Sequence, residues 1–196
     1  MNLKRELERI FEQRGSGFPI PLPPGETPRA AVIALFSGEG FLQSEILLIK
    51  RSLHVATHAG QVALPGGGVE ERDRGDLSET ALRELQEEVG LSREGIHPVG
   101  VLPTLPTVSG GMFIAPFLAY AEPSAWGRAL LPDPHEVAFT EWVRVAALKE
   151  TRREVVREFK GVPLALPEFS WGEERMWGLT ALIFDLILAR YDKLGS

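Results

Sequence analysis

The sequence predicts an α/β fold, in which a mixed set of strands is covered by helices. The first observation is a set of apolar, β-branched segments, which are typical of strands in a sheet core. These segments cover residues 29–36, 45–51, 99–102, 112–120 and 137–145. The second observation is a set of segments that favour helices, at residues 2–14, 77–89 and 177–192. Their order along the chain predicts helices on both faces of one sheet.

The first 28 residues predict an arm that precedes the main domain. Residues 2–14 are charged and amphipathic, which favours a helix and lacks the apolar core of a signal peptide. Residues 18–28 are rich in proline, which excludes a regular helix. We therefore expect an N-terminal helix and proline-rich arm at residues 1–28 and a single domain at residues 29–196.

The next two elements are expected to form a hairpin, and the last element is expected to be a buried helix. Residues 29–36 and 45–51 flank a glycine-containing turn at Gly38–Gly40. Residues 177–191 form the most apolar stretch of the chain, but they include Asp185 and are fewer than the roughly 20 that a bilayer requires. This stretch therefore predicts a helix inside the protein rather than a membrane span.

Residues 77–89 predict an amphipathic helix with a signal at each end. Asp76 and Glu79 resemble a capping box, and Gly90 stands where a left-handed residue ends many helices. Apolar residues recur at spacings of three and four, which predicts one buried stripe. The stripe consists of Leu77, Ala81, Leu82, Leu85 and Val89.

This helix carries three glutamates that predict a site for hard divalent cations. Glu84, Glu87 and Glu88 lie within five residues, so their side chains can converge on one or two metal ions. Carboxylates and substrate phosphates are the ligands that Mg²⁺ prefers, whereas zinc sites more often contain Cys or several His residues. Mg²⁺ or Mn²⁺ is therefore the expected cofactor, and the choice between the two stays open.

A glycine-rich turn precedes the helix. Pro65–Gly68 lets the backbone approach a ligand closely, as a phosphate site requires. Arg83 is positioned to pair with Asp73, which would brace the intervening loop against the helix.

Composition predicts one soluble domain and excludes several classes of protein. The chain has 196 residues, of which 44% are hydrophobic and 24% charged. It has no cysteine, which excludes disulfides and thiol chemistry. A net charge of −6 without a Lys/Arg run argues against binding to nucleic acid. We expect a cytoplasmic protein without membrane contact, and a homodimer through apolar residues of the arm or the last helix stays open.

Residues 67–91 resemble the Nudix box, whose pattern is Gly, five residues, Glu, seven residues, then Arg-Glu-apolar-x-Glu-Glu-x-Gly-apolar. The second half, from Arg83 to Leu91, matches at every specified position. In the first half, Asp73 replaces Glu, and nine residues rather than seven separate it from Arg83. A shorter carboxylate on a longer loop can keep the contact with Arg83. The resemblance implies a Nudix-type α/β/α sandwich with a mixed sheet and a loop-helix-loop.

Residues 47–67 are similar to the motif that precedes this box in Nudix coenzyme A diphosphatases. The residues in register with that motif are Arg51, Ser52, Gly60, Pro65, Gly66 and Gly67. Three residues depart from it, because Ile49 replaces Thr, Ala56 replaces Arg and Leu64 replaces Phe. Residues 58–61 also resemble a His-x-Gly-Gln stretch of that subfamily.

The resemblance implies roles for individual residues. The implied metal ligands are all oxygen donors: Glu84, Glu87, Glu88 and the carbonyl of Gly66. Arg83 is implied to orient the site, and the general base is implied to be Glu87, Glu88 or Glu136. The implied substrate-binding residues precede the helix: Arg51, Ser52, His58, Gly60, Gln61 and Gly67.

The implied activity is metal-dependent hydrolysis of a diphosphate linkage in a small nucleotide. Coenzyme A, cleaved to 3′,5′-ADP and 4′-phosphopantetheine, is the leading substrate. The arginine missing at Ala56 favours the alternatives, which are ADP-ribose, a dinucleotide or a nucleoside triphosphate. A module that binds nucleotides without hydrolysis is a third hypothesis, and the three intact glutamates argue against it.

Overall fold

The computed structural model describes residues 2–13, 25–107, 111–122, 130–159 and 161–195. The N-terminal helix α1 (Leu3–Glu12) begins where the Asn2 side chain accepts a hydrogen bond from the Arg5 backbone N–H. Most of the proline-rich arm predicted at residues 18–28 lies outside the described residues, as does Arg14 at the end of the predicted helix.

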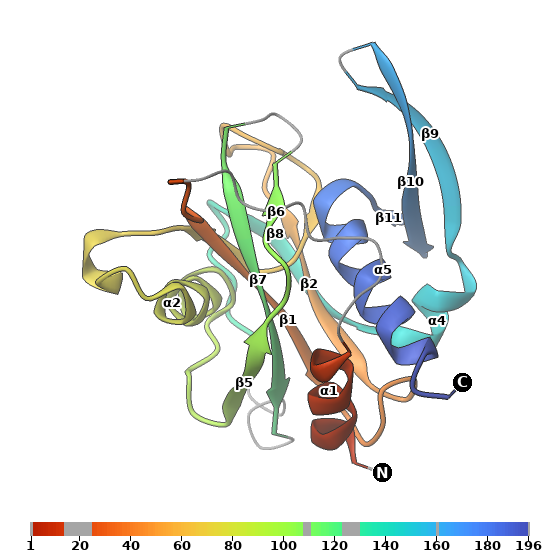
Figure 1. Cartoon of the computed structure of the whole chain (residues 1–196). Helices are drawn as coiled ribbons and strands as arrows, with labels where there is room; N and C mark the ends of the chain where they lie inside the picture. Colours follow the sequence, from red (N-terminus) through yellow and green to blue (C-terminus); the bar gives the residue numbers. More distant parts are fainter. Residues whose placement is uncertain (1, 14–24, 108–110, 123–129, 160, 196) are drawn as a thin grey trace.

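An eight-stranded mixed sheet forms the centre of the molecule (Figure 1). Its strands are β1 (Ala30–Ser37), β2 (Glu45–Arg51), β3 (Val62–Ala63), β4 (Gly66–Gly68), β5 (Ile96–Val101), β6 (Leu105–Pro106), β7 (Phe113–Ala121) and β8 (Val137–Arg144). The order β3-β2-β1-β7-β5 places β1 in the middle, parallel to β7. β1 and β2 pair antiparallel, which confirms the hairpin predicted around Gly38–Gly40.

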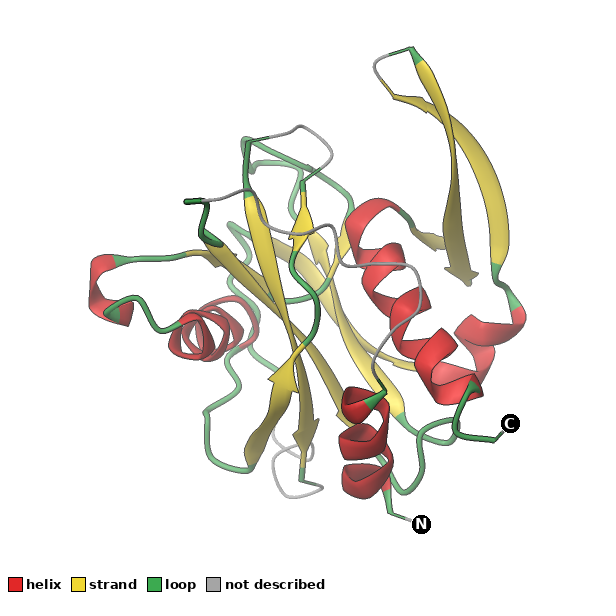
Figure 2. Ribbon diagram, viewed as in Figure 1, coloured by secondary structure: helices red, strands yellow, loops and turns green. Residues whose placement is uncertain are grey.

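Helices cover both faces of this sheet, as the sequence predicts (Figure 2). Helix α2 (Leu77–Val89) packs on one face, and the other face carries α1, α4 (Val145–Glu150) and α5 (Gly178–Asp192). Neighbouring residues of β1 point to opposite faces, so Leu35 packs with the α2 layer and Phe36 with the α1 and α5 layer. None of the described helices is both long and apolar enough to cross a membrane.

A second, three-stranded sheet projects from the body as a long hairpin (Figure 1). It consists of β9 (Arg153–Phe159), β10 (Val162–Trp171) and β11 (Glu174–Met176). Its base is anchored by Phe169, which packs edge-on against Phe184 of α5 with ring centroids 5.0 Å apart. No strand is predicted here from the sequence, because charged and apolar residues occur in pairs along β9 and β10 contains two prolines.

Glu168 is buried on the hairpin and accepts hydrogen bonds from arginines. Its side chain is 3% exposed and contacts Arg153, Arg157 and Arg175. The hydrogen bond from Arg153, followed by that from Arg157, lowers the pKa of Glu168 against the opposing effect of burial. The carboxylate is therefore charged in the folded protein at neutral pH.

Replacing Glu168 with Gln is expected to destabilise the protein at neutral pH by about 1–2 kcal/mol, because charge-assisted hydrogen bonds are lost. The folded pKa is below the unfolded value of about 4.3, so this stabilisation is present above that value and disappears as the pH falls through the folded pKa. Urea unfolding across this pH range checks the prediction. Glu158→Gln, at an exposed position of β9, is the control. A stability difference that persists undiminished in acid would contradict it.

Candidate functional site

The site lies where the neighbouring strands β1 and β2 diverge. The register of β1 with β2 covers only Phe36 and Ser37. Farther along, β2 pairs with β3 and β1 pairs with β4, so the chain from Val62 to Gly68 crosses from one strand to the other. The Ile33 backbone N–H donates to the Pro65 carbonyl over 2.9 Å and holds this crossing in place. The glycine turn consequently lies against helix α2.

Neighbouring atoms leave no room for a side chain at two positions of the glycine turn, Gly66 and Gly67. Gly66 has φ +151°, and a Cβ there would lie 2.3 Å from the Ala31 carbonyl oxygen. A Cβ on Gly67 would lie 2.4 Å from Glu84 Oε1. The missing side chains thus allow β4 to pair with β1 while the Glu84 carboxylate packs against the same backbone.

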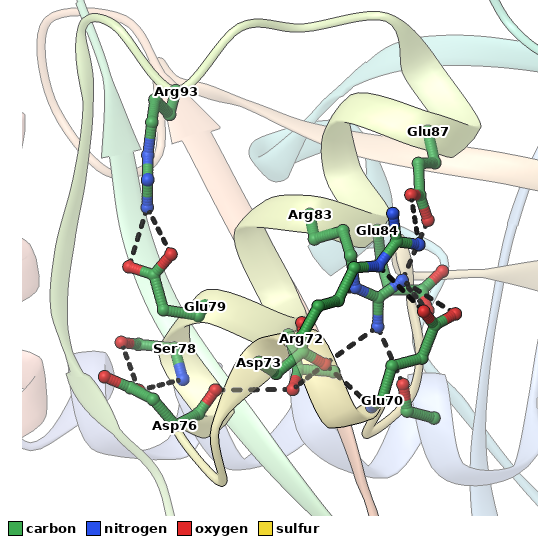
Figure 3. A network of polar contacts seen from close by, with 12 residues as sticks. Glu70, Arg72, Asp73, Asp76, Ser78, Glu79, Arg83, Glu84, Glu87 and Arg93 are labelled. Carbon is green, nitrogen blue, oxygen red and sulfur yellow. Dashed lines mark hydrogen bonds and ion pairs between the residues drawn. The ribbon is translucent and has the colours of Figure 1, made fainter.

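Arg83 is the centre of the polar network beside this turn (Figure 3). Its Nε and one terminal nitrogen contact the two oxygens of Asp73 at 2.9 and 3.0 Å. The predicted pairing with Asp73 is therefore confirmed. The same guanidinium donates to the Gly68 carbonyl, to Glu84 and to Glu87, each over 2.8 Å. One side chain thus connects the turn, the loop and two of the three helix glutamates.

The loop before α2 shows how the chain accommodates its departures from the Nudix pattern. The short helix η1 (Glu71–Asp73) is followed by Arg74 and Gly75, which both have left-handed φ values, 52° and 76°. This path brings the shorter Asp73 carboxylate to Arg83. The Thr80 hydroxyl also donates to Asp73 over 2.8 Å. Hydrogen bonding to Arg83 above all lowers the pKa of Asp73 far below its usual value.

Helix α2 has the predicted bounds but differs at its first turn. Asp76 caps the helix by accepting from the Ser78 backbone N–H, and Gly90 is left-handed at the C-terminus. The Glu79 side chain pairs with Arg93 at 2.7 Å. Asp76 therefore caps the helix by itself, and Glu79 instead forms an ion pair with Arg93 in the segment that follows the helix.

Glu88 is the most buried of the helix glutamates. Its side chain is 1% exposed, accepts from the Gly66 backbone N–H over 2.9 Å and lies 3.4 Å from Arg51. Burial above all, with the charges of Glu84 and Glu136, raises the pKa of Glu88 to about 7 against the opposing effects of Gly66 and Arg51.

Glu84 and Glu136 belong to the same electrostatic cluster. Burial raises the pKa of Glu84, and the charges of Glu87 and Glu136 add to that effect while Arg83 opposes it. Glu136 is exposed, and its backbone carbonyl accepts a hydrogen bond from the Ser52 N–H over 2.8 Å. The structure therefore brings the four glutamates named from the sequence into one region.

The segment between β2 and β3 holds most of the predicted substrate-binding residues. Arg51 ends β2, and its backbone N–H donates to the Gln61 carbonyl over 2.9 Å. Gly60, with φ +70°, closes the loop by donating to the Arg51 carbonyl. The exposed His58 ring contacts the Gln61 side chain at 3.1 Å. Ser52 is buried, and its hydroxyl accepts from a backbone N–H inside the loop.

The donor set fits a hard divalent cation in its chemistry. Four glutamates and the backbone of a glycine turn supply only oxygen donors. Burial, with a smaller effect of the neighbouring glutamates, raises the pKa of Glu84 and Glu88. Arg83 and Arg51 hold three of the carboxylates in the structure. Among the described residues, no three metal-binding side chains surround one point. Cation binding therefore requires these carboxylates to rotate away from the arginines.

Some members of the network, among them Glu70, Arg72 and Thr80, were not singled out from the sequence. Arg72 contacts Glu70 and Glu87, each at 2.7 Å, and so connects the loop to the exposed end of the glutamate cluster. Arg72 lies in a loop without periodicity, so no signal in the sequence marks it. Thr80 does carry a signal, because it lies three residues before Arg83 and so faces the same side of the helix.

Gly66→Ala is expected to destabilise the protein by about 3 kcal/mol or more, because a positive φ and a backbone clash act together. Gly75→Ala is the matched control, since Gly75 also has a positive φ but a Cβ there meets nothing within 4 Å. The control is expected to cost only about 1 kcal/mol. Chemical denaturation of the three proteins measures both values, and equal losses would show that the close approach to β1 is unimportant.

Comparisons with known proteins agree with the fold and the motif. The chain is 34% identical over 142 residues to a protein of Salmonella paratyphi B named as an uncharacterized Nudix hydrolase, NudL, and the match covers 72% of each chain. It is 37% identical over 110 residues to the protein of that name from Pectobacterium atrosepticum, where the match covers 56% of this chain and 48% of the relative. The chain thus spans about half the length of the Pectobacterium protein.

A solved structure has a similar fold. It is a MutT/nudix family protein from Enterococcus faecalis, with a TM-score of 0.56 and 18% sequence identity, and the match covers 98% of this chain and 76% of that one. The model of the NUDIX domain family matches residues 26–161. This segment contains the glycine turn, the loop and the whole of helix α2. The chain therefore belongs to the NUDIX domain family.

Proposed function

We propose that this protein is a metal-dependent hydrolase of nucleotides that contain a diphosphate linkage, and that coenzyme A is its substrate. One observation carries the proposal: Glu84, Glu87, Glu88 and Glu136 gather beside a glycine turn that permits close approach of a ligand. Such a concentration of negative charge has no structural benefit by itself, because carboxylates repel one another. A cation with a phosphate substrate would resolve this conflict.

The cation would be held by Glu84 and Glu88, with Glu87 as a further ligand and the Gly66 carbonyl as a backbone ligand. A bound divalent cation offsets charge on the phosphate oxygens and makes water more acidic. The Gly66 N–H that now binds Glu88 would keep that carboxylate oriented. Arg83 would act as a positioning residue, because Asp73 fixes its guanidinium beside Glu84 and Glu87 while these carboxylates turn toward the cation.

Among the candidate bases, Glu136 is the group that we assign to proton removal from water. Glu87 is paired with both Arg83 and Arg72, and Glu88 is buried against Gly66. The Glu136 side chain is exposed and has no hydrogen bond or ion pair with any described residue. Water would attack one phosphorus, its proton would pass to Glu136, and the bridging P–O bond would break to give 3′,5′-ADP and 4′-phosphopantetheine.

Support for coenzyme A comes from the arrangement of the subfamily motif. Arg51 and the turn at Gly66 and Gly67 both contact the glutamate cluster, and the loop that contains His58 and Gln61 is closed onto Arg51. These contacts support coenzyme A, because Arg51, Gly66 and Gly67 are in register with the coenzyme A motif and lie next to the glutamates that we assign to the reaction.

ADP-ribose is the second candidate, and one observation favours it. Ala56 is exposed in the loop between β2 and β3, and no Lys or Arg follows Arg51 before Gln61. The loop therefore has no cation in place of the arginine of the coenzyme A motif. A substrate with fewer phosphates than coenzyme A would need no such contact.

Product analysis after incubation with coenzyme A, ADP-ribose or NADH, each with Mg²⁺ or Mn²⁺, tests the proposal. We expect 3′,5′-ADP from coenzyme A and a lower rate with the other substrates. Faster cleavage of ADP-ribose would replace coenzyme A with the second candidate. Absence of metal-dependent cleavage in every reaction would leave nucleotide binding without hydrolysis as the function.

Glu88→Gln is expected to lower turnover by about 10²-fold or more and to preserve the fold, because Gln keeps one acceptor for the Gly66 N–H. Steady-state kinetics together with thermal unfolding measures both effects. Glu79→Gln is the matched control on the same helix, since Glu79 pairs with Arg93 outside the cluster. A turnover near that of the wild type would remove Glu88 from the mechanism.

Glu136→Gln and Glu84→Gln are expected to impair activity in different ways. Loss of a general base lowers turnover by about 10²–10⁴-fold, and because Glu136 is not assigned as a ligand, the Mn²⁺ affinity should be retained. Glu84→Gln should weaken Mn²⁺ binding, measured by calorimetry or by paramagnetic relaxation of water. If Glu136→Gln lost Mn²⁺ affinity instead, Glu136 would be a ligand rather than the base.

A further inference from the structure

The second sheet concentrates arginines around one carboxylate, away from the glutamate cluster. Arg153 faces Glu168 across the ladder of β9 and β10, and Arg157 lies farther along the same face of β9. Arg175 of β11 lies opposite Ser170 and so joins this face from the other side. All three guanidiniums contact Glu168. We call these three arginines, with Glu168 and Trp177, the arginine cluster.

The cluster has more positive charge than its internal partner can neutralise. Three guanidiniums surround one carboxylate, and their side chains are 54%, 41% and 60% exposed for Arg153, Arg157 and Arg175. Each guanidinium has five N–H donors, whereas a carboxylate accepts only about four hydrogen bonds. Most of the donors therefore face solvent. The acidic residues Glu154 and Glu158 alternate with the arginines along β9 and so point to the opposite face.

A purely structural ion pair does not require this number of arginines. Arg152, at the start of the same hairpin, pairs with Asp185 one to one through two hydrogen bonds. Glu168 is already bound by Arg153 at one oxygen and by Arg157 at the other. Arg175 approaches to only 3.4 Å, adds repulsion between like charges and is the most exposed of the three. Its position is better explained by an additional anion.

An aromatic ring adjoins the charged groups. Trp177 follows β11 directly and is 37% exposed. The Arg157 guanidinium lies 4.8 Å from the centre of the Trp177 ring. Arginines that present free donors next to a partly exposed indole offer hydrogen bonds to phosphate and a surface on which a base can stack.

We propose that the arginine cluster binds a phosphate group of a nucleotide at a place distinct from the glutamate cluster. The planar guanidinium fork matches two phosphate oxygens, so Arg157 and Arg175 would contact the ligand while Arg153 and Glu168 hold the cluster together. The hairpin lies beyond the α5 side of the central sheet, whereas α2 covers the other side (Figure 1). The phosphate belongs either to a remote part of the substrate or to a free nucleotide.

The first experiment measures binding without catalysis. Calorimetry with 3′,5′-ADP, inorganic phosphate and uncharged adenosine is performed on the full chain in EDTA, so the result does not depend on the proposed hydrolysis. We expect Arg157→Gln and Arg175→Gln to weaken 3′,5′-ADP binding about ten-fold each, the size of one lost charged contact. Arg152→Gln removes an equally charged neighbour that has its own partner, and it should bind as the wild type does.

Thermal unfolding in phosphate-free buffer verifies that each variant is folded, and the shift on adding 3′,5′-ADP gives a second measure of binding. We expect a smaller shift for Arg175→Gln than for Arg152→Gln. Equal affinities and equal shifts in all four proteins would overturn the proposal and leave the cluster as a structural ion-pair network.

A kinetic comparison distinguishes the two sources of the phosphate, and this part rests on the proposed function. If the cluster binds the remote phosphate of the substrate, Arg175→Gln should raise KM for coenzyme A about ten-fold and leave KM for 3′-dephospho-coenzyme A unchanged. If it binds a free nucleotide, both KM values should stay at the wild-type level while calorimetry still shows weaker binding. A protein without hydrolytic activity would fail only this comparison.

Discussion

The contact between Arg83 and Asp73 is the interaction on which the rest of the site depends. Asp73 is buried and charged, and the same guanidinium binds the Gly68 carbonyl and two glutamates of α2. Removing this cation would leave a buried carboxylate unpaired and adjacent glutamates in mutual repulsion, which is more costly than the loss of an exposed ion pair. This one side chain therefore connects the loop to the last residue of the glycine turn and orients two of the helix glutamates, Glu84 and Glu87.

The separation of β1 from β2 explains why the site lies at this place. Once the two strands part, the chain between β3 and β4 can enter the gap, and glycine is the residue that permits β4 to pair with β1 there. The segment between β3 and β4 directs the Gly66 N–H toward Glu88, which satisfies one oxygen of this buried carboxylate of α2. The pKa of Glu88 is about 7 because burial disfavours the charged carboxylate and because Glu84 and Glu136 carry the same charge nearby. Positive charge is in excess in the second sheet, whereas negative charge is in excess around α2, because three arginines of the second sheet contact a single glutamate, Glu168.

Elements with strong local signals were predictable from the sequence. Helix α2 has the predicted bounds, because Asp76 and Gly90 terminate it and the apolar stripe leaves one register for packing. Strand β2 also has the predicted bounds, and the approach of Asp73 to Arg83 followed from the motif despite the longer loop. The three-glycine strand β4 was missed, since glycine has no preference for strands and is extended here only through its pairing with β1. The hairpin of β9 and β10 was missed because charged and apolar residues occur in pairs along β9 and β10 contains two prolines, so neither strand shows an alternating pattern.

The sequence by itself determined the family, the chemistry of the donor groups and the face of the helix that carries them, because spacing along one helix converts directly into position. Only the tertiary structure decided which carboxylates pair with arginines, which are buried and which are exposed to solvent. Glu84, Glu87 and Glu88 are alike in the sequence, yet one packs against Gly67, one is exposed beside Arg72 and one is buried against Gly66. Likewise, Arg153, Arg157 and Arg175 become one cluster only when antiparallel pairing aligns three strands. Burial and charge balance depend on residues far apart in the chain, and for that reason spacing alone does not reveal them.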